Sequence, residues 1–261
     1  SGEEEALKGG TDLIFGANPV TECIRAGRRR VHEVFIVRGR EGGRHDEIAR
    51  LAETSGIPIR SVDPSWMASR FRDREDQGVA ASADGFSYSD LQALLDERGH
   101  AGPPLAVALD QVQDPRNLGA IARSAVAFGA TGMIIHKDRS AAVTPAAVKA
   151  SAGIIEHLDV SMVTNLARAL AAARDAGLSI VGLEGGAGAS IYEVDLLVPA
   201  VLVGGGEDSG LRRLTREACD CLASIPIDGR CQSLNASTAT AVALAEASRQ
   251  RRRAAGPGDG R

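Results

Sequence analysis

Three polar segments carry the side chains best suited to chemistry, and each follows an apolar run. The first holds Asn117 and Arg123, the second Glu207, and the third Ser233 and Asn235. Arginine fixes phosphate and stabilises negative charge, while carboxylate, hydroxyl and amide groups orient a substrate hydroxyl. If the apolar runs are parallel strands, the three segments meet at the carboxyl ends of those strands, where such sheets bind ligands.

Each segment alone also fits an ordinary structural role, because Asn and Ser cap helices and glycines make turns. The second segment, Gly204-Gly205-Gly206, allows a close backbone approach. It is neither a GxGxxG motif nor a phosphate-binding loop with Lys-Ser/Thr, which disfavours a nucleotide-binding dehydrogenase. Asn117 and Arg123 are six residues, about 600°, apart on a helix. They can converge only if the chain bends where the loop enters the helix.

The elements needed to position these residues alternate along the chain, which predicts an α/β fold with a parallel sheet covered on both faces. In the second half we expect strands at 105–109, 132–136, 178–183, 200–204 and 222–227, and helices at 117–128, 144–151, 164–176, 211–219 and 235–253. In the first half we expect strands at 31–37, 57–62 and 78–82, and helices at 18–26, 45–55 and 64–71, the first capped by Asn18-Pro19.

These elements divide the chain into two domains. A disordered acidic N-terminus (1–11) precedes a small α/β domain (12–84). A linker (85–104) ending in Gly-Pro-Pro leads to a larger domain (105–253), and a disordered Gly- and Pro-rich tail (254–261) follows.

The 261 residues have a formal net charge of −4, which argues against a protein that coats nucleic acid. Arginine nevertheless outnumbers lysine 27 to 3 and is concentrated in residues 25–44. We find no apolar stretch of transmembrane length and no secretory signal. Without such a signal we expect reduced thiols and a cytoplasmic location. The four cysteines lack zinc-site spacing, so we expect no metal.

Together, the three segments resemble the motifs of the SpoU (TrmH-like) RNA ribose 2′-O-methyltransferases of the SPOUT superfamily. The matches are Asn117-x-Gly119-x-x-x-Arg123, Gly205-x-Glu207-x-x-Gly210 and Ser233-Leu234-Asn235-x-Ser237. The resemblance covers residues 12–253 and is greatest to the RlmB subfamily, and the first half resembles its L30e-like RNA-binding domain. Asp208-Ser209 departs from the smaller residues usual after the motif glutamate.

The resemblance implies a parallel sheet whose C-terminal segment forms a trefoil knot, and S-adenosylmethionine as cofactor. It implies catalytic roles for Asn117, Arg123, Glu207, Ser233 and Asn235. It implies that the cofactor contacts Gly205, Ile225, Leu234, Leu202, Gly204, Ile227 and Ser237.

The substrate implied is a guanosine ribose in the peptidyl-transferase region of 23S rRNA, presented as naked rRNA or as a precursor particle. A homodimer through the larger domain is also implied. A tRNA guanosine, another rRNA nucleotide and a non-catalytic assembly factor remain alternatives. We expect the RNA phosphates to contact Arg25, Arg28, Arg29, Arg30, Arg38 and Arg116.

Overall fold

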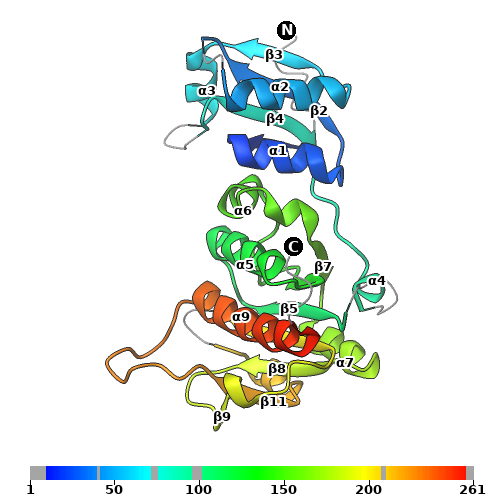
Figure 1. Ribbon diagram of the computed structural model, residues 1–261, viewed down its shortest axis with the longest axis vertical. Coiled ribbons are helices and arrows are strands. Elements are labelled where there is room, and N and C mark those ends of the chain that lie inside the picture. Colours follow the sequence, from blue (N-terminus) through cyan, green and yellow to red (C-terminus); the bar gives the residue numbers. More distant parts are fainter. Residues whose placement is uncertain (1–9, 40–41, 72–75, 96–101, 207–209, 257–261) are drawn as a thin grey trace. The chain divides into compact units, whose positions relative to one another are not determined.

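The computed structural model describes residues 10–39, 42–71, 76–95, 102–206 and 210–256 (Figure 1). The chain divides into two compact units. The first comprises residues 1–87 and 143–157, and the second comprises residues 88–142 and 158–261. The stretch 143–157 falls within the larger domain of the sequence prediction, yet it packs with the first unit. The N-terminal residues 1–9, most of the predicted tail, and residues 96–101 of the predicted linker lie outside the described residues.

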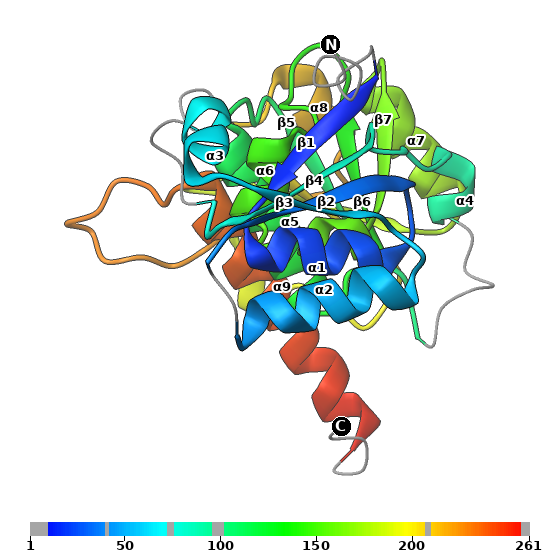
Figure 2. The same ribbon diagram turned by 90° about the horizontal axis from the view of Figure 1, so that it is seen from above.

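The first unit is built on a four-stranded mixed sheet in the order β1-β4-β2-β3. Strand β4 is antiparallel to β1 and β2, and β3 is parallel to β2. A core of apolar side chains, including Phe15, Phe35 and Met67, packs in this unit. The elements are β1 (Thr11–Phe15), α1 (Ala17–Ala26), β2 (Val31–Val37), α2 (Arg44–Thr54), β3 (Ile59–Val62), α3 (Pro64–Arg70) and β4 (Val79–Asp84). Helices α1 and α2 lie side by side (Figure 2).

Helix α1 begins one residue earlier than its sequence predicts, so the expected Asn18 cap is wrong. It starts after Gly16, whose φ of 98° is a conformation that glycine adopts at little cost. A Cβ at Gly16 would lie 2.6 Å from Nζ of Lys149. The Asn18 side chain instead accepts a hydrogen bond from Arg44.

The segment 143–157 adds α6 (Pro145–Ala150) and a 3-10 helix, η3 (Ile154–His157), to the first unit. Thr144 caps α6 as predicted, because its hydroxyl accepts a hydrogen bond from the amide of Ala147. Helix α6 packs on β1, and η3 packs on α1.

The second unit contains a seven-stranded sheet in the order β7-β6-β5-β10-β8-β11-β9, and every strand pair in it is parallel. The predicted α/β fold is therefore confirmed. The strands are β5 (Leu105–Asp110), β6 (Gly132–His136), β7 (Asp159–Val163), β8 (Ser179–Leu183), β9 (Ala189–Ser190), β10 (Ala200–Gly205) and β11 (Cys221–Ser224). The helices are α4 (Leu91–Leu95), α5 (Pro115–Ala127), α7 (Leu166–Asp175), η4 (Ile191–Glu193), α8 (Arg213–Glu217) and α9 (Ala236–Ala255).

The order of the strands brings the end of the chain back to the middle of the sheet. Strand β10 pairs with β5 on one side and β8 on the other, and β11 lies beyond β8. After β11, the chain returns so that α9 packs on β10 and α5 (Figure 1). Threading into a trefoil knot stays a prediction of the resemblance.

No helix in the described ranges combines the length and the apolarity that a membrane span requires.

Candidate functional site

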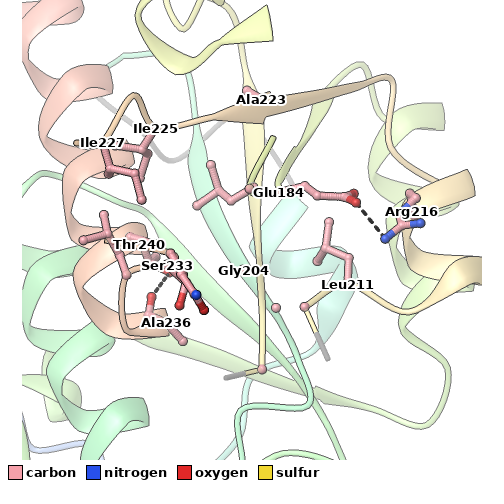
Figure 3. Close-up of a pocket in the computed structure, with 18 residues that line it drawn as sticks. Glu184, Gly204, Leu211, Arg216, Ala223, Ile225, Ile227, Ser233, Ala236 and Thr240 are labelled. Atoms are coloured by element: carbon pink, nitrogen blue, oxygen red, sulfur yellow. Dashed lines mark hydrogen bonds and ion pairs between the residues drawn. The ribbon is translucent and has the colours of Figure 1, made fainter. Parts of the chain in front are cut away.

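A cavity of about 280 Å³ opens at the carboxyl ends of β8, β10 and β11 in the second unit (Figure 3). Its volume is near the lower end of small-molecule sites, about 300 Å³. Segments far apart in the sequence supply its wall. The lining residues are Leu183, Glu184, Gly185, Gly204, Gly205, Gly206, Gly210, Leu211, Arg216, Ala223, Ile225, Ile227, Gln232, Ser233, Leu234, Ala236, Ala239 and Thr240.

Glycines form one wall because the backbone leaves no room for side chains there. A Cβ at Gly205 would lie 2.4 Å from the carbonyl carbon of Gly210. At Gly206 it would lie 2.6 Å from the carbonyl oxygen of Gln111, at the end of β5. The Gly210 amide donates to the Gly206 carbonyl at 3.1 Å. Gly204, Gly205 and Gly206 line the cavity without side chains, so a ligand there would meet their backbone atoms.

Apolar side chains form the opposite wall. Ile225 and Ile227 follow β11, which ends at Ser224, so the predicted strand 222–227 ends three residues too late. Both isoleucines point into the cavity (Figure 3), and 39% of Ile227 is exposed. Leu234 lines the cavity just before α9. Such a surface suits the face of a flat aromatic ring such as adenine.

Glu184 and Arg216 are the only charged side chains among the described lining residues. A Glu184 carboxylate oxygen lies 2.7 Å from a guanidinium nitrogen of Arg216 (Figure 3). Sequence reasoning missed both. The signal for Glu184 was available, because it directly follows the apolar strand 178–183 at the edge where parallel sheets bind ligands.

Asn117 and Arg123 both lie inside α5, so the bend that their convergence would require is absent there. This helix begins at Pro115 and is capped by Asp114, whose side chain accepts from the amide of Arg116. Positions six residues apart on one helix point in different directions. Neither Asn117 nor Arg123 lines the cavity, and Arg123 is exposed.

Residues of the third segment have two different roles, because one lines the cavity and another caps helix α9. Ser233 lines the cavity, whereas the side chain of Asn235 accepts hydrogen bonds from the amide (2.8 Å) and hydroxyl (2.6 Å) of Ser237. This is the capping role that the sequence left open for Asn235. Ser237 and Leu202 do not line the cavity, and Leu202 is buried within β10. Glu207 lies outside the described residues.

Asp110, at the end of β5, is a third residue that sequence reasoning missed. It is 1% exposed and accepts hydrogen bonds from the backbone amide (2.8 Å) and Nε (3.2 Å) of Arg212. These bonds tie the end of β5 to the chain that leaves Gly210. They therefore help to hold the glycine wall in place.

The predicted RNA-contacting arginines have different environments. Arg25, Arg30, Arg38 and Arg116 are exposed, and Arg28 is half-buried. Arg38 lies 3.3 Å from Asp63, and Arg116 lies 3.1 Å from Asp114.

Arg29 contradicts the sequence prediction, since its side chain is fully buried and ion-paired with Asp12 (2.7 Å) and Glu156. Burial alone lowers the pKa of Arg29, but the charge of Glu156, together with the hydrogen bonds to Glu156 and Asp12, more than offsets this, so the pKa is raised. An RNA phosphate could reach the guanidinium only by breaking these pairs.

The thiols differ in burial: Cys23 is buried, Cys219 and Cys221 are half-buried, and Cys231 is exposed. Burial raises the pKa of Cys23 to about 11 and that of Cys219 to about 12, which leaves both protonated at neutral pH. Cys231 is exposed next to the cavity-lining Gln232. In the described part of the chain, no three His, Cys, Asp or Glu side chains gather in a way that could hold a metal ion.

Two family models match the chain and together cover both halves. Residues 104–245 match the SpoU rRNA methylase family, and residues 13–89 match the substrate-binding domain of RNA 2′-O ribose methyltransferases. A tRNA/rRNA methyltransferase of uncharacterised function from Mycolicibacterium gilvum is 42% identical over 231 residues, covering 88% of this chain and 73% of the relative.

Solved structures give the same assignment. The SpoU methyltransferase AviRb from Streptomyces viridochromogenes, in complex with AdoMet, is 28% identical with a TM-score of 0.78, covering 93% of this chain and 91% of AviRb. An AdoMet-bound rRNA methyltransferase from Sinorhizobium meliloti is 25% identical with a TM-score of 0.76. The match covers 95% of this chain and 90% of the S. meliloti chain. The motifs, the strand order and these matches agree, and the chain belongs to the SpoU family of RNA ribose methyltransferases.

Proposed function

We propose that this SpoU enzyme transfers a methyl group from S-adenosylmethionine to the ribose 2′-hydroxyl of a guanosine in large-subunit rRNA. One observation carries the proposal: the second and third motif segments, far apart in the sequence, meet at one cavity. The match of residues 13–89 to a substrate-binding domain supports a structured RNA as substrate. The restriction to guanosine and to 23S rRNA rests on the resemblance to the RlmB subfamily.

The cavity fits the cofactor in both of its surfaces. The glycine wall offers backbone groups, because Gly205 and Gly206 line the cavity and carry no side chains. The wall of Ile225, Ile227 and Leu234 offers an apolar surface for adenine. When bound, the cofactor supplies an already activated methyl group on a sulfonium. The protein must therefore align the ribose hydroxyl and assist loss of its proton.

Arg123 is the residue proposed to assist the hydroxyl. A guanidinium stays protonated, so it is a poor base. It suits instead the fixing of the adjacent phosphate and the stabilisation of negative charge developing on the oxygen. Asn117, Glu207, Ser233 and Asn235 are proposed to orient the ribose and the surrounding loops.

We assign Arg123 to the partner's site in a homodimer. The exposed Arg123 does not line its own chain's cavity. A second chain that brings its own α5 to the cavity supplies the guanidinium of Arg123 that the first chain does not place there. A symmetric dimer then holds two equivalent sites.

Methyl transfer to deproteinised large-subunit rRNA is the direct test. We expect label from methyl-labelled cofactor to appear at one guanosine 2′-oxygen, located by mapping the alkali-resistant phosphodiester bond. A matching tRNA transcript is the control. Methylation of the tRNA alone, or of another rRNA nucleotide, would overturn the substrate assignment while leaving the reaction intact. Failure to bind S-adenosylmethionine would instead favour an assembly factor.

Protection of Cys231 tests the cofactor site without any RNA. At pH 8 we expect iodoacetamide to label the exposed Cys231 well before Cys23 and Cys219, whose burial suppresses the reactive thiolate. S-adenosylmethionine should slow labelling of Cys231 at least about threefold, because the bound ligand orders the adjoining segment. Mass spectrometry of the tryptic peptides measures both rates. Unchanged labelling of Cys231 at saturating cofactor would contradict the assignment.

A further inference from the structure

The first unit contains a segment that the sequence alone assigns elsewhere. Residues 143–157 lie inside the match to the methylase family, which runs from 104 to 245. The substrate-binding match ends at residue 89. The compact unit nevertheless joins 143–157 to residues 1–87.

A buried charge cluster lies where this segment packs. The side chains of Arg29 and Glu156 are both 0% exposed, and they form an ion pair with each other. Arg29 also donates to a carboxylate oxygen of Asp12 at 2.7 Å and to the carbonyl oxygen of Asp84 at 3.1 Å. Arg28 donates through Nε to the carbonyl oxygen of Glu156 at 3.1 Å. Glu156 thus receives bonds from two consecutive arginines of the N-terminal sequence.

Close packing surrounds the charge cluster. His157 lies 2.8 Å from the carboxylate of Glu22 in α1. Gly153 has a φ of 86°, and a Cβ there would lie 2.8 Å from both the Cα of Pro19 and the Cβ of Glu22. The ammonium group of Lys149 lies 5.7 Å from the ring centre of Phe15. The segment is therefore fitted to α1 and β1 along its length.

Stability alone is a weak explanation for such a pair. Removing two charges from water is costly, and apolar side chains in the same place are often equally stable or more so. Nε of Arg29 and Oε2 of Glu156 have, moreover, no hydrogen-bond partner among the described residues. A buried pair does allow only one arrangement, because displacing either partner leaves an uncompensated buried charge.

We propose that Arg29 and Glu156 are positioning residues that make residues 143–157 an integral part of the substrate-binding unit. The segment continues directly into the catalytic sheet, since β6 ends at His136 and β7 begins at Asp159. The chain therefore passes between the two units three times, at 87/88, 142/143 and 157/158. Three connections restrict a substrate-binding unit far more than a single linker does. They raise the effective concentration of the bound RNA at the catalytic cavity.

Hydrogen exchange of the full-length protein tests the role of the Arg29–Glu156 pair without any assay of activity. We expect Glu156→Gln to speed amide exchange in β1 and α1 as well as in 143–157, at least about tenfold, because Arg29 loses its fully buried charged partner and this destabilises the whole unit. Exchange in β5 and β10 should not change. Glu217→Gln is the matched control, since it removes the carboxylate of an exposed pair, 2.6 Å from Arg213. Faster exchange confined to 143–157, or none at all, would overturn the proposal.

A double-mutant cycle keeps the test valid if the single variant unfolds. We expect Arg29→Met with Glu156→Met to exchange more slowly in α1 than either single variant, because neither fully buried position then carries a charge and the carboxylate of Asp12 is 26% exposed to water. Additive effects would show that the pair does not act as a unit.

The consequence for catalysis rests on the proposed function. In Glu156→Gln we expect kcat/KM for rRNA to fall at least about tenfold through KM, while the Kd for S-adenosylmethionine stays within about twofold. A fall in cofactor affinity of the same size would indicate general misfolding and contradict a positioning role. Wild-type protein that methylates no RNA would refute the proposed function but leave the exchange result standing.

Discussion

Gly205→Val is expected to abolish measurable S-adenosylmethionine binding, a loss of at least about 100-fold in affinity. Gly205 ends β10 and lines the cavity, and a Cβ there would lie 2.4 Å from the carbonyl carbon of Gly210 and 2.7 Å from the amide nitrogen of Leu211. These are backbone atoms, so no side-chain rotation relieves the collision. The segment must move, and the wall proposed to hold the cofactor moves with it. Isothermal calorimetry with S-adenosylmethionine measures the loss.

A second glycine in the same cavity provides the matched control. Gly185 also lines the cavity, but a Cβ there meets no atom within 4 Å. Gly185→Ala should therefore bind the cofactor within about threefold of the wild type. Thermal unfolding of each variant without cofactor separates a damaged site from a damaged fold. If a folded Gly205→Val protein keeps wild-type affinity, the glycine wall does not hold the cofactor.

The fold was largely predictable because its signals are local. The fully buried strand at Leu105–Asp110 appears as a continuous apolar run, and Thr144 with Pro145 marks a helix start. Strand β9 has only two residues, and β7 (Asp159–Val163) has a sequence, DVSMV, without the long apolar run of a central strand. Neither carries a pattern strong enough to predict it.

Residues of the site could be predicted from the sequence only where they belong to a recognised motif. Gly205, Ile225 and Leu234, for which the resemblance implies cofactor contacts, line the cavity. Glu184 and Asp110 escaped notice because their roles depend on contacts with Arg216 and Arg212, which lie more than 30 residues away in the sequence.

The error at Arg29 has the same origin. It belongs to an arginine-rich run, Arg28-Arg29-Arg30, whose composition suggests a phosphate-binding surface. The three arginines differ in how far their side chains are buried. Arg30 is exposed and Arg28 half-buried, whereas Arg29 points inward to Glu156, 127 residues along the chain. No local pattern distinguishes an arginine that faces RNA from one that anchors a distant segment.

Arg123→Ala is expected to lower kcat for rRNA methylation at least about 100-fold, with cofactor affinity unchanged. The guanidinium is exposed on α5 and does not line its own cavity, so its loss should leave the cofactor wall intact. Single-turnover methylation at saturating cofactor, together with calorimetry, separates these two effects. Arg213→Ala, which removes an exposed arginine paired with Glu217 in α8, is the control and should affect kcat less than about threefold.

Mixing two inactive variants determines which chain supplies Arg123. If the partner supplies it, a heterodimer of Arg123→Ala and Gly205→Val contains one complete site, with an intact cavity from the first chain and an arginine from the second. Random assembly makes half of the dimers heterodimers, so the co-refolded mixture should recover about a quarter of wild-type activity. If each chain uses its own arginine, neither chain of the heterodimer has both parts, and the mixture stays inactive. Recovered activity would thus place α5 of one chain at the cavity of its partner, and an inactive mixture of folded dimers would rule that arrangement out.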